Sequence, residues 1–219
     1  MISGPPPSED VAAATRQRRR LPAAQRRQLV LDAALRTFAA NGYDGAAMEQ
    51  IAAAAGVSKA VVYDHVSSKD ELYSMVLDSI RIQLVAVVET ALEPARGPGE
   101  PRVRAAVAAL FGYVEEHPEA ARLLCRELQD ANHSEIGSEL HERLTATLLA
   151  TLSNEQGLLE IGAERERQLL IFAELLKAAM LGLVVWWFRN PDVAREDLVE
   201  RLTMVVWPAL ERAWTPPAS

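Results

Sequence analysis

The sequence is poor in cysteine, in aromatic residues and in long apolar runs. Cys125 is the single cysteine, so no disulfide can close within the chain, which is typical of a reducing compartment. The longest apolar run, Ala178 to Phe188, is far shorter than the roughly 20 residues that span a bilayer. The N-terminus lacks the apolar core of a signal peptide. We therefore expect a soluble, cytoplasmic protein with no membrane partner.

Alternating patterns of β-branched residues are also absent, which excludes a substantial sheet. Apolar residues make up 49% of the chain, alanine is abundant, and glycine and proline gather in a few clusters. This composition favours a folded, all-α protein. We expect about nine helices, at residues 22–40, 47–54, 58–65, 68–92, 102–116, 118–132, 134–152, 163–189 and 193–213.

The net charge of −7 is distributed unevenly along the chain. From Arg16 to Asp70 there are nine Lys or Arg against five Asp or Glu, whereas the remainder from Glu71 holds 14 against 23. A local positive field attracts phosphate whatever the total charge is. We expect a disordered arm over 1–20, a basic DNA-binding head over 21–67, and an acidic helical domain over 68–219. Beside such a head, Arg18, Arg19 and Arg20 are candidates for phosphate or minor-groove contacts, although an isolated basic cluster is more often a solvated tail.

Two very short helices follow one another in "AAAAGVSKAVVYDHVSSKDEL". Gly56 permits a tight turn between them, and Ser58 is placed to cap the second. Such helices need a third to pack on, which predicts a helix-turn-helix whose second helix enters the major groove of DNA. Val57, Val62 and Val66 are predicted to point inward. The opposite face is predicted to consist of Lys59, Ala60, Tyr63 and Asp64.

The stretch "VLDAALRTFAANGYDGAAMEQIAAAAGVSKAVVYDHVSSKDELY" resembles the DNA-binding domain of TetR-type transcriptional regulators. The resemblance implies a homodimer that binds a palindromic operator on double-stranded DNA, represses transcription, and is released by a small molecule. Ala46 and Ala47 stand where the family usually has Thr or Ser, and Val66 stands where it usually has Phe. By position, the implied DNA contacts are Ala47, Ser58, Lys59, Ala60, Val61, Tyr63, His65 and Lys69. In direct readout, Ala60 and Val61 would meet thymine methyl groups, and Lys59 would reach guanine or phosphate.

The last two expected helices are apolar on more than one face. This predicts a four-helix seam between two subunits, the alternative being ordinary burial within one subunit. The candidate interface residues are Leu183, Trp186, Trp187, Leu202, Val206, Trp207 and Leu210. Trp214 is a further candidate anchor.

Apolar residues on the middle helices are candidates for an effector pocket, the alternative being plain core packing. An apolar lining predicts a small hydrophobic effector. The candidate lining residues are Leu110, Phe111, Val114, Leu124, Leu128, Leu144, Leu148, Phe172, Leu176 and Met180. Polar residues placed to orient a ligand are Tyr113, Cys125, Gln129 and His141.

Other chemistry finds little support in the sequence. His133, Glu135, His141 and Glu142 do not have the spacing of a metal site, and no nucleophile–base set or phosphate-binding loop is present. We expect neither an enzyme nor a cofactor. The leading hypothesis is a ligand-released repressor. Its alternatives are a dimeric DNA-binding regulator without a small-molecule ligand, and a helical ligand-binding protein whose head no longer binds DNA.

Overall fold

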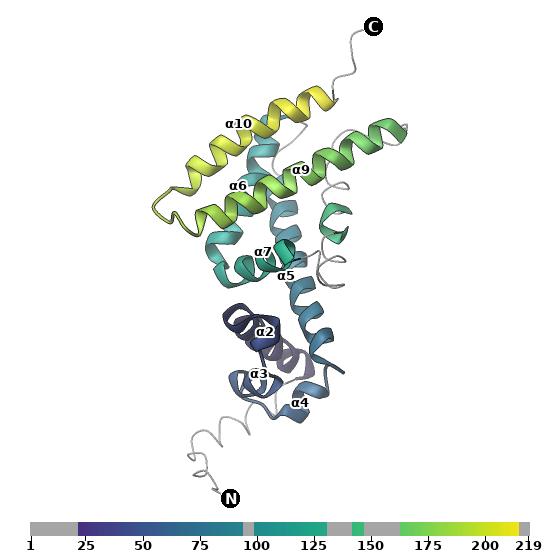
Figure 1. Cartoon of the computed structure of the whole chain (residues 1–219), viewed down its shortest axis with the longest axis vertical. Coiled ribbons are helices and arrows are strands. Elements are labelled where there is room, and N and C mark those ends of the chain that lie inside the picture. Colours follow the sequence, from purple (N-terminus) through teal and green to yellow (C-terminus); the bar gives the residue numbers. More distant parts are fainter. Residues whose placement is uncertain (1–21, 94–98, 131–141, 147–162, 215–219) are drawn as a thin grey trace, which may run out of the picture. The chain divides into compact units, whose positions relative to one another are not determined.

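The computed structural model describes residues 22–93, 99–130, 142–146 and 163–214, and within them every regular element is a helix (Figure 1). The expected all-α fold is confirmed, and the expected helix at 134–152 lies mostly outside these ranges, with 142–146 helical. The helices are α2 (Ala23–Gly45), α3 (Met48–Ala55), α4 (Lys59–Tyr63), α5 (Lys69–Leu92), α6 (Glu100–Glu116), α7 (Pro118–Asp130), α9 (Ala163–Trp187) and α10 (Arg195–Trp214).

The chain divides into two compact units, and the division falls between Asp78 and Ser79, inside α5. We expected the boundary before this helix, at residues 67 and 68. It lies further along because the first turns of α5 belong to the head. Four apolar side chains of these turns are at most 3% exposed: Leu72, Tyr73, Val76 and Leu77.

The head, meaning the described residues up to Asp78, is shaped by two glycines. Gly42 interrupts α2 with φ 73° and ψ 177°, two residues beyond the expected end of the first helix at residue 40. Gly56 ends α3 in the left-handed conformation, with φ 67° and ψ 34°, where a side chain would be strained. Ser58 then caps α4, its Oγ accepting a hydrogen bond from Val61 N at 3.4 Å. The glycine turn and the serine cap together set the angle between the two short helices.

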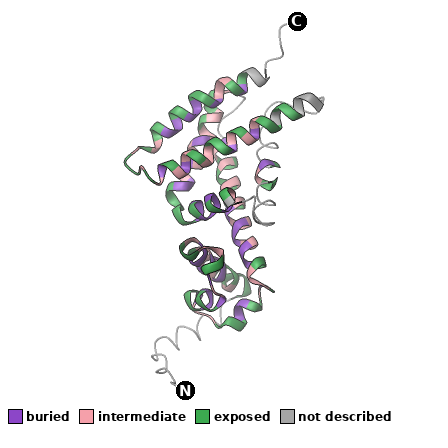
Figure 2. Ribbon diagram, in the orientation of Figure 1, coloured by how far each residue is buried: buried purple, intermediate pink, exposed green. Residues whose placement is uncertain are grey.

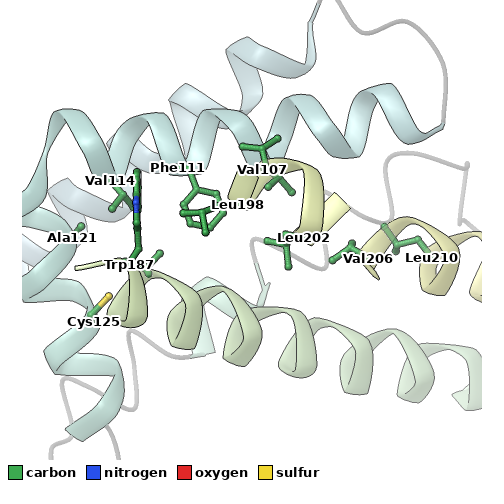
Figure 3. Packing of buried hydrophobic residues seen from close by; sticks show 12 residues of the cluster. Val107, Phe111, Val114, Ala121, Cys125, Trp187, Leu198, Leu202, Val206 and Leu210 are labelled. Carbon is green, nitrogen blue, oxygen red and sulfur yellow. The ribbon is translucent and has the colours of Figure 1, made fainter. Parts of the chain in front are cut away.

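The core of the second unit runs between α6 and α10 (Figure 3). Phe111 meets Trp187 edge-to-face, with ring centroids 5.6 Å apart, and Trp187 Nε1 donates to the carbonyl oxygen of Val193 at 2.9 Å. Figure 3 shows Leu198 and Leu202 of α10 facing this cluster. The core therefore joins α6 and α10 to the end of α9.

Figure 2 shows exposed positions along α9 and α10. Several of these positions carry large apolar side chains, which we call the exposed apolar stripe. On α9, Ile171, Leu175 and Trp186 fall within about 60° of one another around the helix axis, so they share one face, whereas Leu170 lies to one side of it. The 18-residue stretch Leu170–Trp187 is long and apolar enough to cross a membrane, yet only 22% of it is buried within the chain. The exposed large side chains on these helices are Leu170, Ile171, Leu175, Trp186, Met204 and Val205.

Candidate DNA-binding surface and effector cavity

The recognition helix α4 presents one exposed face and buries the other. Val62 is fully buried and Val66 is 3% exposed, as expected, whereas Val57 is only partly buried. The expected exposed face is confirmed for Lys59, Ala60, Tyr63 and Asp64. Val61 is 9% exposed and packs into the head, so the expectation that it meets thymine methyl groups does not fit the structure. Ala60 remains as the small apolar residue of the exposed face.

Lys59 at the start of α4 forms an ion pair with Glu49 of α3. Both side chains are about half exposed or more, and the Lys59 ammonium also lies 5.7 Å from the centre of the Tyr63 ring. The ion pair lowers the pKa of Glu49 through its hydrogen bond from Lys59, and raises the pKa of Lys59 in turn. A base-reading or phosphate-binding role for Lys59 must therefore compete with Glu49.

The first turn of α5 holds a second cation in place. The Lys69 ammonium lies 4.4 Å from the centre of the Tyr43 ring and donates to the carbonyl oxygen of Asp44 at 3.4 Å. Tyr43 OH donates to Asp70, and this bond raises the pKa of Tyr43 to about 12. Ser68 caps the helix, its Oγ accepting from Glu71 N at 3.1 Å. Because the turn combines the positive end of the helix dipole with a fixed lysine, it suits an anionic phosphate.

The Glu71 side chain bonds back to the residue before the Ser68 cap. The Glu71 carboxylate accepts from Ser67 N and Ser67 Oγ, both at 2.6 Å, rather than from Ser68. These bonds lower the pKa of Glu71.

The N-terminus of α3 lacks a capping side chain, as the sequence indicates. Ala47 occupies the cap position and carries no acceptor, whereas Gln50 Oε1 accepts from Ala47 N at 3.1 Å. Ala46 is buried in the head, and His65 is partly buried, its Nε2 atom having no hydrogen-bond partner among the described residues. Ala47 thus contributes backbone and a small side chain to the surface, without the hydroxyl usual in the family. Arg18, Arg19 and Arg20 lie outside the described residues.

The second unit contains a cavity of about 230 Å³, partly open to solvent, between helices α5, α6, α7, α9 and α10 and the segment 142–146. Of the residues predicted to line a pocket, the structure brings together Leu110, Val114, Leu124, Leu128, Leu144, Leu176 and Met180, together with the polar residues Tyr113 and Cys125. The lining is overwhelmingly apolar, which suits a hydrophobic ligand.

Two predicted lining residues lie elsewhere. Phe111 is fully buried against Trp187, and Phe172 packs against the same core. Gln129 is exposed on α7 and does not line the cavity, while Leu148 and His141 lie outside the described residues. Both phenylalanines predicted to line the pocket therefore serve the core instead of the cavity.

Sequence reasoning missed the wall that α5 provides. Leu84 and Val88 lie one helical turn apart and share a face, but this spacing does not distinguish a cavity wall from ordinary core packing. The sequence-based prediction also left out Lys177, because only apolar residues were expected to line the cavity. Further lining residues are Val85, Glu89, Val103, Ala106, Val107, Ala121, Leu181, Val184, Val206 and Leu210.

Two titratable groups in the cavity wall are held neutral by burial. Burial raises the pKa of Cys125 to about 11 and that of Tyr113 to about 12. Tyr113 OH lies 3.4 Å from Gln83 Oε1 and donates to it. Cys125 is therefore a small core residue with little thiolate at neutral pH. In the part of the chain that the structure describes, no group of three potential metal ligands gathers.

Some of the predicted interface residues are exposed and others are buried. Trp186 is 45% exposed, but Trp187, Leu202, Val206 and Leu210 are buried in the core of their own unit. Leu183 and Trp207 are partly buried against that core, and the Trp214 side chain lies outside the described residues. The alternative of burial within one subunit thus fits most of them. The exposed stripe on α9 and α10 takes their place as candidate interface.

A helix-turn-helix head followed by an all-α unit with an apolar cavity defines a class of DNA-binding regulators. Residues 30–76 match the model of the tetR family of bacterial regulatory proteins, and residues 87–216 match the tetracyclin repressor-like C-terminal domain. The chain belongs to the TetR family and is a helix-turn-helix transcriptional regulator.

Similar proteins support this assignment. The transcriptional activator FasR of Mycolicibacterium smegmatis is 31% identical over 194 residues, covering 87% of this chain and 85% of that protein. A transcriptional regulator from Rhodococcus sp. Rha1 has a similar structure, with a TM-score of 0.70 and 25% identity over 87% of this chain and 99% of that one. The fatty acid degradation regulator FadR of Bacillus halodurans shares the fold, with a TM-score of 0.67 and 17% identity over 82% and 97% of the two chains.

Proposed function

We propose that this protein is a cytoplasmic, one-component regulator that binds a palindromic operator as a homodimer and changes its DNA affinity when a small hydrophobic effector enters the cavity. The observation that carries the proposal is the pairing of an exposed recognition face on α4 with an apolar cavity of about 230 Å³ in the same chain. One unit has the surface of a DNA reader and the other has the interior of a ligand-binding domain.

The DNA contacts that we propose come from three places in the head. Lys59 and Ala60 lie on the exposed face of α4 and would enter the major groove, whereas Tyr63 on the same face would contact the neighbouring DNA backbone. Lys69 and the first N–H groups of α5 would bind a phosphate. The basic arm would add contacts outside the groove, with Arg18 to Arg20 as its candidates. Val61 is not part of this set, because its side chain is buried.

The homodimer is supported by the exposed apolar stripe. Leu175 is 64% exposed, Met204 is 64% exposed and Val205 is 71% exposed, and such a patch is costly in contact with water. Gly182 lies on the same face of α9, and a side-chain carbon added there would meet no atom within 4 Å. A helix of a second copy can therefore approach α9 closely. Two copies would place two recognition helices on two half-sites.

The direction of regulation has two candidates. Repression is the role that the resemblance implies. Activation is favoured by the name of the M. smegmatis relative, which is called an activator. A reporter gene placed behind a bound operator separates them: deletion of the regulator raises expression if it represses and lowers expression if it activates.

Variants of the head test the DNA-binding part of the proposal. We expect Tyr63→Ala and Lys69→Ala to weaken binding to all sequences. Lys69→Ala should also flatten the salt dependence by about 0.9 in log–log slope, because a lysine that pairs with a phosphate releases a counterion and the neutral tyrosine does not. Changes at Lys59 or Ala60 should instead alter sequence preference. Fluorescence anisotropy with labelled duplexes at several salt concentrations measures both effects. Unchanged affinity in Tyr63→Ala would show that α4 does not dock in this way.

A further inference from the structure

A buried lysine forms part of the cavity wall. Lys177 lies on α9, lines the cavity and is 8% exposed. Glu89, the other charged lining residue, lies on α5 and is exposed. An ammonium group loses its hydration in an apolar wall unless polar partners replace the water, so lysine is rarely found there. Among the described lining residues, Lys177 is thus the one cation.

The partners of Lys177 place its ammonium between the cavity and the surface. Nζ donates to Thr145 Oγ1 and, at 2.9 Å, to Glu174 Oε1, and Thr145 Oγ1 donates to the same oxygen at 2.7 Å. We call Lys177, Thr145 and Glu174 the rim cluster. Lys177 lines the cavity, but its two partners do not. The Glu174 side chain is 41% exposed, against 10% for that of Lys177. The cation therefore reaches from the cavity wall towards a solvent-exposed carboxylate.

We propose that the rim cluster receives the carboxylate of a small amphiphilic acid whose apolar body fills the cavity. This inference rests on the proposed function of the cavity as the effector site. A carboxylate fits Lys177 better than a neutral acceptor does, because it adds the attraction of opposite charges to the hydrogen bond. An amine is disfavoured by repulsion from the same ammonium. The apolar wall accounts for the rest of the molecule.

Glu174 allows the ligand to bind without leaving a buried charge unpaired. Because its carboxylate is already partly exposed, it can turn into water and regain hydration while the ligand carboxylate takes its place. Lys177 then stays paired throughout the exchange. Thr145 keeps a polar partner in either arrangement, since its hydroxyl can donate to either carboxylate. The exchange changes a contact between α9 and the segment 142–146. Ligand binding would therefore alter how these two segments pack.

The volume of the cavity and the charges in its lining restrict the class of ligand further. The cavity volume of about 230 Å³ is below the roughly 300–1,000 Å³ of common ligand clefts, so a single-chain or single-ring acid fits better than a large conjugate. Glu89, on α5, repels an acid, whereas Lys177, on α9, attracts it. The ligand carboxylate is therefore oriented towards α9, and its apolar end towards the α5, α6 and α7 walls.

Calorimetric titration of the full chain with decanoate, decanol and decylamine, each below its micelle concentration at neutral pH, tests the inference. We expect decanoate to bind about tenfold more tightly than decanol, and decylamine to bind least. Lys177→Met, which conserves volume and apolar packing, should abolish the preference for decanoate and keep the binding of decanol. Glu174→Gln should keep or strengthen the binding of decanoate. Arg126→Met removes one exposed cation from α7, away from the cavity lining, and should change none of the three affinities.

Two results would overturn the inference. They differ in whether the cavity would still be an effector site. Equal binding of decanoate and decanol, unchanged in Lys177→Met, would remove the carboxylate site but leave the cavity as a site for apolar effectors. If none of the three probes bound, both the carboxylate site and the role of the cavity as effector site would be wrong. DNA binding by the same preparation reports separately on the head.

Discussion

Single residues decide how the two short helices of the head begin. Ser58 supplies a capping hydroxyl to α4, whereas Ala47 supplies none to α3. The sequence predicts both facts, because a cap depends on residue type and position alone. It does not predict that Gln50 Oε1 bonds back to Ala47 N, or that Glu71 bonds to Ser67. Such pairings depend on the side-chain conformation that each local backbone allows.

Ala47→Ser should stabilise the head. A serine at this position can accept a hydrogen bond from the first turn of α3, which is worth about 1 kcal/mol. Urea denaturation followed by circular dichroism measures the change, and a higher midpoint with an unchanged slope is expected. Ala54→Ser, at an exposed position inside α3, is the control and should be neutral or slightly destabilising. The account of the cap would be wrong if the two variants unfolded at the same urea concentration.

Glu49→Gln should strengthen DNA binding. The change removes the partner that holds Lys59, so the lysine is released to contact a phosphate or a base edge. We expect a several-fold gain in affinity at low salt and a salt slope steeper by about 0.9 in anisotropy titrations. Glu116→Gln makes the same change in net charge on α6 and serves as the control. If the two variants gained affinity equally, the effect would belong to net charge and not to the ion pair.

At the scale of helices, the sequence predicts where elements lie better than which faces they bury. Helix positions follow from apolar spacing, glycines and caps, and the expected elements of the described ranges appear with ends shifted by a few residues. The faces of α9 and α10 are harder to predict, because both helices are apolar on several sides. Leu202, Val206 and Leu210 share a stripe with period four, which fits a core as well as an interface. The packing of α10 against α6 is what assigns this stripe to the core and not to an interface.

Leu175→Glu should weaken the proposed homodimer. The side chain is 64% exposed in the middle of the α9 stripe, and a carboxylate there would lose its hydration on association. By symmetry each dimer would carry the change twice. We expect the dissociation constant from sedimentation equilibrium to rise at least tenfold. Ile82→Glu, at a 57% exposed position on α5, is the control and should not change association. Equal association of both variants and the unchanged protein would place the interface elsewhere.

At the scale of the whole molecule, the proposed function depends on two units, a head proposed to bind DNA and a helical unit that contains the cavity. Composition and motifs predict a basic head before an acidic helical body. The two family models match residues 30–76 and 87–216. The cavity is predicted only in part. Its lining comes from five helices and the segment 142–146, so residues such as Lys177 and Leu84 become neighbours through tertiary packing that no local pattern encodes.

The central claim, that the protein reads a palindromic operator as a dimer, is tested most directly by selection of bound duplexes from a random DNA pool at near-physiological salt. The account predicts an enriched inverted repeat whose half-site centres lie one helical turn of DNA, about 10 base pairs, or a multiple of it apart. Absence of any enriched sequence, obtained with protein that circular dichroism shows to be folded, would contradict it.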